Sequence, residues 1–214
     1  MIPPGAHALV DFVASGLPGQ GPLRLAFGAP LRVLQTDDPT AVRALINEAE
    51  AEAARGHWCV GYLAYEAAAA FDSALPTHAG AGPLAWFGVH EAPLGHSGED
   101  EGDDPSTVRA EWRDAPVARD TFNADLCALL AAIEAGEVYQ VNHSARRRGR
   151  LHAGSTRALF EALRRAQPEG FLMWLDAGDH QVLSLSPELF FDWDGDAILL
   201  RPMKGTAPRD ADPA

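Results

Sequence analysis

The chain has 214 residues, enough to bury a core as one large domain or as two small ones. Its 30 acidic residues against 17 lysines and arginines give a formal charge of −13, which repels phosphate backbones, so we expect no nucleic-acid partner. No apolar run approaches the ~18 residues of a membrane span, and the N-terminus lacks the basic region of a signal peptide. We therefore expect a cytoplasmic protein with no membrane partner.

The two cysteines, Cys59 and Cys127, show neither metal-binding nor redox-active spacing. This usage is typical of a reducing compartment, and we expect both thiols to be buried as small apolar groups.

The first half of the chain predicts one helix and two strands. Asp38, followed by a proline, is typical of a helix start, and apolar residues recur at helical spacing up to Ala49. Gly56 is expected to end this helix. Residues 58–65 and 84–90 read as strands.

A polar, acidic stretch over residues 95–107 predicts a mobile surface loop or, less well, a linker between subdomains. A strand is expected at 108–113. A helix is expected from about Asp120 to the stop at Gly136. Residues 138–144 alternate with the period of a strand.

A short helix, capped by Ser155 and ending near Ala166, precedes three extended runs at 171–176, 181–186 and 197–201. Turn sequences separate these runs, which predicts an antiparallel meander. The order of elements predicts an α+β fold rich in antiparallel sheet.

Common catalytic motifs are absent from the sequence: there is no P-loop, no HExxH and no GxSxG. The eight histidines are scattered, and surface or hydrogen-bonded roles explain them best. Arg146, Arg147 and Arg148 could bind an anion, although a solvated strand end is the favoured interpretation.

Three segments carry possible chemistry. The first is GEVYQVN at 136–142, where Gln140 and Asn142 share one face of the expected strand. The second is SLSPELFF, where Glu188 follows a proline among bulky apolar residues. A desolvated carboxylate there would suit proton transfer, whereas a helix-start glutamate facing water is the equally weighted alternative.

The third segment is RPMKGTAPR at 201–209, in which Lys204 lies in a turn bracketed by prolines. A lysine acts as a nucleophile only when neutral, and the nearby cations Arg201 and Arg209 could favour that state. The same arginines could bind substrate carboxylates through paired hydrogen bonds. A solvated loop lysine is the simpler alternative.

Taken in this order and spacing, the three segments resemble the chorismate-binding enzymes, over about residue 120 to the end. Lys204 resembles the lysine of the aminodeoxychorismate synthase component I type, where anthranilate synthases carry alanine. Upstream, GYLAYEAAAAFD and PLAWFGVHEAP resemble the forms fused to an aminodeoxychorismate lyase-like domain. The resemblance implies a β-sandwich core with flanking helices.

The resemblance also implies a reaction. Lys204 would attack C2 of chorismate with loss of the C4 hydroxyl, and ammonia from a partner glutamine amidotransferase would then give 4-amino-4-deoxychorismate for folate synthesis. Glu188 would transfer the proton, and Gly205 and Thr206 would contact the substrate. Mg²⁺ is implied as well, although its ligands are expected in a further C-terminal region and none in this chain.

The resemblance further implies an N-terminal subdomain at 1–115 and the first part of a catalytic domain at 116–214, expected to be truncated and inactive alone. The alternatives are an anthranilate synthase component I-like enzyme, or a non-catalytic remnant that binds a partner or an aromatic effector such as tryptophan. Trp58, Phe171 and Trp174 would form the walls of an effector site, although a core role suits these aromatics better.

Overall fold

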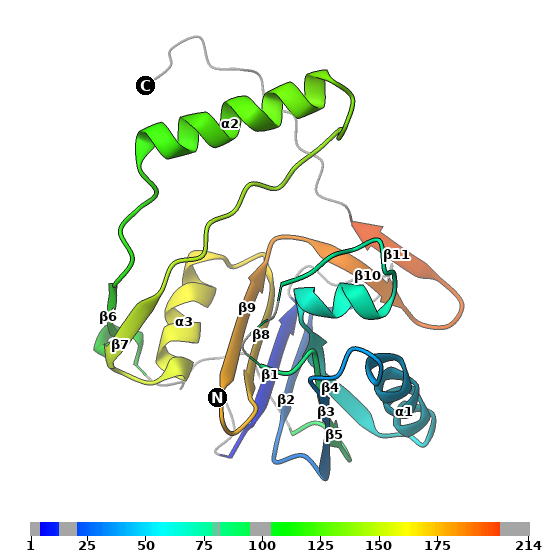
Figure 1. Ribbon diagram of the computed structural model, residues 1–214. Helices are drawn as coiled ribbons and strands as arrows, with labels where there is room; N and C mark the ends of the chain where they lie inside the picture. Colours follow the sequence, from blue (N-terminus) through cyan, green and yellow to red (C-terminus); the bar gives the residue numbers. More distant parts are fainter. Residues whose placement is uncertain (1–4, 13–20, 79, 81, 95–103, 202–214) are drawn as a thin grey trace.

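The computed structural model describes residues 5–12, 21–78, 80, 82–94 and 104–201. The elements in chain order are β1 (Ala8–Phe12), β2 (Leu23–Phe27), β3 (Arg32–Thr36), α1 (Val42–Ala54), β4 (Trp58–Leu63), η1 (Tyr65–Ala70), β5 (Ala85–His90), η2 (Pro105–Thr107), β6 (Arg109–Trp112), α2 (Arg119–Glu134), β7 (Gly149–Ala153), α3 (Thr156–Ala166), β8 (Phe171–Asp176), β9 (Gln181–Ser186), β10 (Leu189–Trp193) and β11 (Ile198–Arg201). Figure 1 shows their arrangement.

Two antiparallel sheets form the centre of the molecule. One has the strand order β2-β1-β8-β9 and the other β3-β5-β4. Their facing sides share a core that includes Val10, Phe27, Trp86 and Leu175. The expected α+β fold with a β-sandwich core is confirmed.

Each sheet is covered on its outer side by one helix. Phe160 of α3 packs against Leu9 and Trp174 of the four-stranded sheet. On the other side, Leu45 of α1 packs against Val89 of the three-stranded sheet. The apolar periodicity expected for the first helix therefore predicts the face that α1 buries.

Several predicted boundaries hold and one does not. Ser155 caps α3 by accepting a hydrogen bond from the Ala158 amide at 3.0 Å, as expected. The first helix begins at Val42 rather than at Asp38, which instead accepts a hydrogen bond from the Thr40 amide in a tight turn.

The predicted strand at 138–144 is wrong, because this stretch runs as an irregular, exposed segment between α2 and β7. Period-two alternation indicates a strand only where a partner strand is available, and no described strand pairs with it. The expected meander instead forms two separate hairpins, β8–β9 and β10–β11.

The thiols differ from expectation as well. Cys59 is half-buried and Cys127 on α2 is exposed. Burial raises the pKa of the Cys59 thiol, and the nearby Glu52 carboxylate adds to the effect. The Cys127 expectation failed because α2 packs none of its residues into a core in the described structure.

Candidate functional site

Glu188 lies in the short link between β9 and β10. The Ser186 hydroxyl accepts a hydrogen bond from the Glu188 amide at 3.1 Å and donates one to the Glu188 carbonyl at 2.9 Å. Pro187 lacks an amide hydrogen, so the ladder of β9 stops there and the chain turns into a second hairpin.

The Glu188 residue is exposed, so the expected desolvation is not found in the described structure. Its bulky neighbours do not cover it, because Phe190 is 81% exposed and Phe191 50% exposed. Sequence neighbours bury a carboxylate only when they pack over it. The water-facing alternative is therefore correct, although in a strand-to-strand link rather than at a helix start.

Arg201 is the last residue of β11, and it pairs with Leu189 in the antiparallel register. Directly opposite residues in such a ladder lie about 5 Å apart between their Cα atoms. The SPELFF segment and the start of RPMKGTAPR therefore meet at one end of a single hairpin. Lys204, Gly205, Thr206 and Arg209 lie outside the described residues, so a cavity shared by Glu188 and Lys204 stays a prediction.

The GEVYQVN segment follows α2 and begins at Gly136, which has a φ of +75°. Gln140 and Asn142 are both exposed.

The three consecutive arginines lie in three different environments. The Arg147 guanidinium lies 4.6 Å from the ring centroid of Trp112, and the Arg148 side chain pairs with Asp114 at 3.1 Å. Arg146 lines a cleft of about 590 Å³ between the two sheets. Of these three, Arg146 is the one that lines this cleft.

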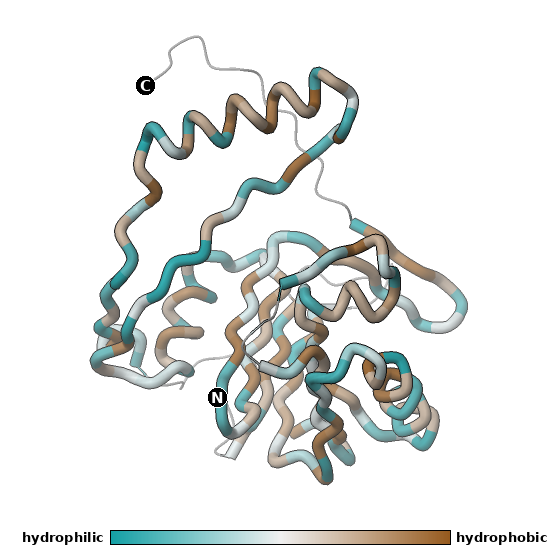
Figure 2. The backbone as a smooth tube through the Cα atoms, viewed as in Figure 1, coloured by the Kyte–Doolittle hydropathy of each residue, from teal (hydrophilic) through white to brown (hydrophobic). Residues whose placement is uncertain are grey.

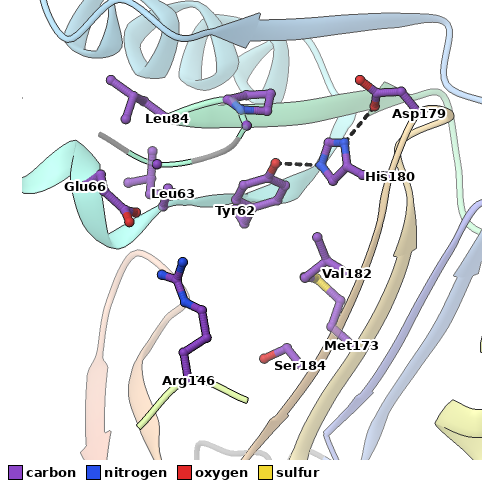
Figure 3. Close-up of a pocket in the computed structure, with 14 residues that line it drawn as sticks. Tyr62, Leu63, Glu66, Leu84, Arg146, Met173, Asp179, His180, Val182 and Ser184 are labelled. Carbon is purple, nitrogen blue, oxygen red and sulfur yellow. Dashed lines mark hydrogen bonds and ion pairs between the residues drawn. The ribbon is translucent and has the colours of Figure 1, made fainter. Parts of the chain in front are cut away.

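This cleft between the two sheets, here called the sheet cleft, is shown in Figure 3. Its walls come from β4, the loop before β5, the β8–β9 hairpin and the segment before β7. The lining residues are Tyr62, Leu63, Ala64, Glu66, Gly80, Gly82, Pro83, Leu84, Arg146, Met173, Asp179, His180, Val182 and Ser184.

A chain of hydrogen bonds closes one end of the sheet cleft. The Tyr62 hydroxyl lies 2.7 Å from His180 Nε2, and His180 Nδ1 lies 2.6 Å from Asp179 Oδ1. Burial raises the pKa of the Tyr62 hydroxyl, and the Asp179 charge adds to this; the His180 hydrogen bond lowers the pKa of Asp179.

Local sequence patterns contain little sign of this arrangement. His180 was one of eight scattered histidines, and it does have hydrogen-bond partners as expected. Its contact with Tyr62 spans 118 positions, which no local pattern reveals. The GYLAYE segment, which supplies Tyr62 and Glu66, was the one available signal.

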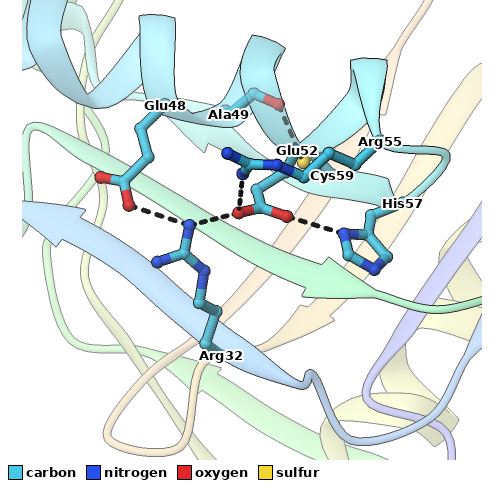
Figure 4. A network of polar contacts seen from close by, with 7 residues as sticks. All are labelled: Arg32, Glu48, Ala49, Glu52, Arg55, His57 and Cys59. Carbon is cyan, nitrogen blue, oxygen red and sulfur yellow. Dashed lines mark hydrogen bonds and ion pairs between the residues drawn. The ribbon is translucent and has the colours of Figure 1, made fainter.

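A second polar cluster surrounds Glu52 at the end of α1 (Figure 4). This carboxylate, 6% exposed, contacts Arg32 at 2.6 Å, Arg55 at 2.7 Å and His57 at 2.7 Å. The His57 hydrogen bond lowers the pKa of Glu52, with help from both arginines against the effect of burial. Its partners saturate the carboxylate, so the cluster fixes α1 to β3 and β4 and offers no open site.

The aromatic residues considered for an effector site do not converge. Phe171 packs edge-on against Phe12, while Trp174 packs with Phe160 on the opposite face of the same sheet. Trp58 is 42% exposed and lies beside Phe27. Phe171 and Trp174 are core residues, in line with the favoured alternative.

The described ranges contain no group of three histidine, cysteine or carboxylate side chains that could hold a metal ion. No described helix is long and apolar enough to cross a membrane.

Comparison with known proteins places this sequence in a class of chorismate-utilising enzymes. The sequence pattern of the chorismate binding enzymes matches residues 24–214, so the chain belongs to the chorismate binding enzyme family. No solved structure matches the chain.

Two kinds of curated relative share similar identity with the chain. Aminodeoxychorismate synthase component 1 of Klebsiella aerogenes is 33% identical over 61% of this chain and 27% of its own length. The Escherichia coli protein of the same name is 32% identical over 50% of this chain and 23% of its own length. Anthranilate synthase component 1 of Thermus thermophilus is 34% identical over 46% and 21%. The matched stretches thus span about a quarter of these relatives.

Proposed function

We propose that this chain is part of an aminodeoxychorismate synthase component I, which converts chorismate and ammonia to 4-amino-4-deoxychorismate. The observation that carries the proposal is the pairing of Leu189 with Arg201, because it places the residue after Glu188 opposite the first residue of the RPMKGTAPR segment, at one end of the β10–β11 hairpin. Two groups that act on one small ring must lie within a few ångströms of it.

The proposed chemistry proceeds in two displacements. The neutral Lys204 amine forms a bond to C2 of chorismate and gives up a proton, both conjugated ring double bonds shift by one position, and the C4 hydroxyl leaves as water with a proton from Glu188. Ammonia then bonds to C4 and gives up a proton, both double bonds shift back, and the C2–nitrogen bond breaks to release the lysine amine, which takes up a proton. Covalent catalysis of this kind replaces one difficult displacement by two easier ones.

The remaining residues would hold the substrate. Arg201 and Arg209 would bind carboxylates through paired hydrogen bonds, while Gly205 and Thr206 would contact the ring through a tight turn and a hydroxyl. The exposed position of Glu188 is compatible with this role only if substrate or further polypeptide covers it during turnover. Mg²⁺ would neutralise a substrate carboxylate, and a glutamine amidotransferase would supply the ammonia.

Product analysis tests the proposal. The polypeptide that carries these residues in the cell, given chorismate, Mg²⁺ and ammonia, should form 4-amino-4-deoxychorismate. Lys204→Ala should lower kcat far more than it raises KM, because it removes a group needed in the transition state and leaves carboxylate binding in place. Arg147→Gln is the matched control, since it removes a cation from an exposed stacking residue and should leave kcat unchanged.

An anthranilate-forming activity is the second candidate, because anthranilate synthase component 1 sequences match at 34–36% identity. The two candidates differ in the carbon that receives nitrogen. Anthranilate as the main product of the unmodified protein would replace the proposal. A minor amount formed only by Lys204→Ala would support it, because C2 is then open to ammonia.

A further inference from the structure

The backbone of Glu188 is bound by one side chain from the preceding strand. The Ser186 hydroxyl accepts a hydrogen bond from the Glu188 amide at 3.1 Å and donates one to the Glu188 carbonyl at 2.9 Å. Both backbone polar groups of Glu188 therefore converge on a single hydroxyl, which acts as donor and acceptor at once.

These two hydrogen bonds determine where the Glu188 side chain begins. The amide belongs to the peptide plane before the Glu188 Cα atom, and the carbonyl belongs to the plane after it. Because each peptide unit is planar and rigid, orienting both planes also orients the Cα–Cβ bond. The position of the carboxylate then depends only on the side-chain rotamers of Glu188.

Backbone control matters at this position because the side chains around it are exposed. Glu188 and Pro187 are exposed, and the ring of Phe190 is 81% exposed. Pro187 fixes its own φ angle and not the torsions that follow it. Ser186 supplies contacts on both sides of the Glu188 Cα atom, where those torsions lie.

The Ser186 hydroxyl has a rigid support. Ser186 is the last residue of β9 and pairs with the buried Phe171 of β8. β8 lies inside the four-stranded sheet, between β1 and β9. On the other side of Glu188, the buried Leu189 begins β10. Ser186 therefore links the orientation of Glu188 to the core of the molecule.

We propose that Ser186 is a positioning residue, which orients the Glu188 carboxylate for proton transfer to the substrate. This inference rests on the proton-transfer role that the proposed function gives to Glu188. Preorganised geometry is important for such a step, because a displacement of about 1 Å can cost roughly a hundredfold in rate. Ser186 acts through Glu188 and does not itself touch the substrate.

The kinetic test compares three single variants of the polypeptide that carries these residues in the cell. Ser186→Ala should lower kcat by about tenfold to a hundredfold and change KM by less than about twofold, because substrate binding is retained. Ser186→Thr keeps the hydroxyl on a side chain suited to a strand and should restore kcat to within about threefold of the parent. Ser106→Ala is the matched control, since it removes a hydroxyl that donates to Asp104 in another turn, and it should leave kcat unchanged.

A double variant separates positioning from a general structural effect. Glu188→Gln removes the proton donor and should lower kcat by about a hundredfold or more. In the Glu188→Gln background, Ser186→Ala should change kcat by less than about twofold, because there is no proton donor left to orient. A further tenfold loss in that background would show that Ser186 acts on another group and would overturn the proposal.

Hydrogen exchange tests the same hydrogen bonds without turnover. In the 214-residue chain, the Glu188 amide should exchange about tenfold faster in Ser186→Ala than in the parent, since it loses its acceptor. The amide of Leu172, which is buried in β8, should exchange equally in both proteins, which separates a local change from loss of folding. Equal exchange at Glu188 in the two proteins would overturn the proposal.

The kinetic outcomes distinguish this inference from the proposed function. A parent that consumes chorismate without forming 4-amino-4-deoxychorismate contradicts the proposed function, whereas the Ser186 variants are still compared by their rates of chorismate consumption. Parent kcat in Glu188→Gln contradicts the proton-transfer role and the positioning role together. Parent kcat in Ser186→Ala, with 4-amino-4-deoxychorismate as the product, overturns the positioning role alone.

Discussion

The two-sheet core and the part formed by α2, the segment at 137–148 and the β10–β11 hairpin differ sharply in burial. In the core, Trp86, Phe27 and Leu172 are 2% exposed or less. On α2, by contrast, no residue is buried, and Leu130 is 55% exposed. Figure 2 shows apolar residues along α2 although the helix stands apart from the sheets. The sequence pattern that forms a helix and the packing that stabilises it are thus separable in this molecule.

The largest expected effect concerns two tryptophans, Trp86 in the core and Trp112 outside it on β6. Trp86→Ala should lower the free energy of unfolding by about 3–5 kcal/mol, because it opens a cavity between the two sheets. Trp112→Ala should cost no more than about 1 kcal/mol, since that residue is 64% exposed and its ring lies under the Arg147 guanidinium. Urea unfolding measures both changes. Equal losses in the free energy of unfolding would show that the two tryptophans do not differ in packing.

Two glycines with positive φ give the next test. Gly178, at +94°, lies in the turn between β8 and β9, where Gly178→Ala should cost about 1 kcal/mol in global stability. Gly136, at +75°, follows the end of α2, so Gly136→Ala should reduce helix content without moving the main unfolding midpoint. Circular dichroism at about 222 nm, followed together with tryptophan fluorescence, distinguishes the two. A shared midpoint shift would mean that α2 unfolds with the core.

The Glu52 cluster predicts an acid-sensitive term in the stability of the core region. The hydrogen bond from His57 is the main cause of the lowered pKa of Glu52 in the folded protein. The charged Glu52 carboxylate therefore stabilises the folded state fully above the ordinary pKa of 4.5, and this stabilisation is lost as the pH falls through the lowered pKa. The stability difference between the parent and Glu52→Gln should therefore shrink below pH 4.5.

Glu111→Gln is the matched control, because Glu111 pairs with His152 at 3.2 Å across the exposed two-stranded sheet of β6 and β7. Its difference from the parent should stay small and nearly constant over the same pH range. The other carboxylates are the same in the parent and in the variant, so their effects on stability cancel in the difference between the two proteins. A Glu52→Gln difference that does not change with pH would show that the cluster does not favour the charged carboxylate.

The smallest effect on stability should come from the apolar face of α2. Phe122, Leu126 and Leu130 are exposed, and their joint replacement by serine should change the unfolding midpoint by little. The same replacement should remove much of the fluorescence of a hydrophobic dye, because exposed apolar surface binds such dyes. A large midpoint shift with unchanged dye binding would instead place this face in a packed interface.

Elements with strong local signals could be predicted from the sequence. Ser155 and Pro168 bracket α3 within a few residues, and the turns around Gly178 and Gly195 separate the three expected runs, which form β8, β9 and β11, whereas β10 was not expected. β1 and β2 were missed, because their apolar runs are only five residues long and sit beside glycine-rich sequence. The partner of β1, which is β8, lies some 160 positions away, and no local pattern indicates such a pairing.

Part of the candidate site could be predicted from the sequence and part could not. The order of the three segments indicated the family, because family membership can be recognised from sequence alone, and the family is confirmed. The exposure of Glu188 could not be predicted, since burial depends on what packs over a residue and not on the bulk of its neighbours. The sheet cleft was missed because its walls come from separate stretches of the chain.

The covalent state of Lys204 tests the proposed function most directly. The polypeptide that carries these residues is incubated with chorismate and Mg²⁺ without ammonia, then digested and weighed by mass spectrometry. We expect an added mass of chorismate less water on the peptide that contains Lys204, and its absence in Lys204→Ala. No adduct in the parent, together with normal formation of 4-amino-4-deoxychorismate by Lys204→Ala once ammonia is supplied, would contradict the proposed role of this lysine.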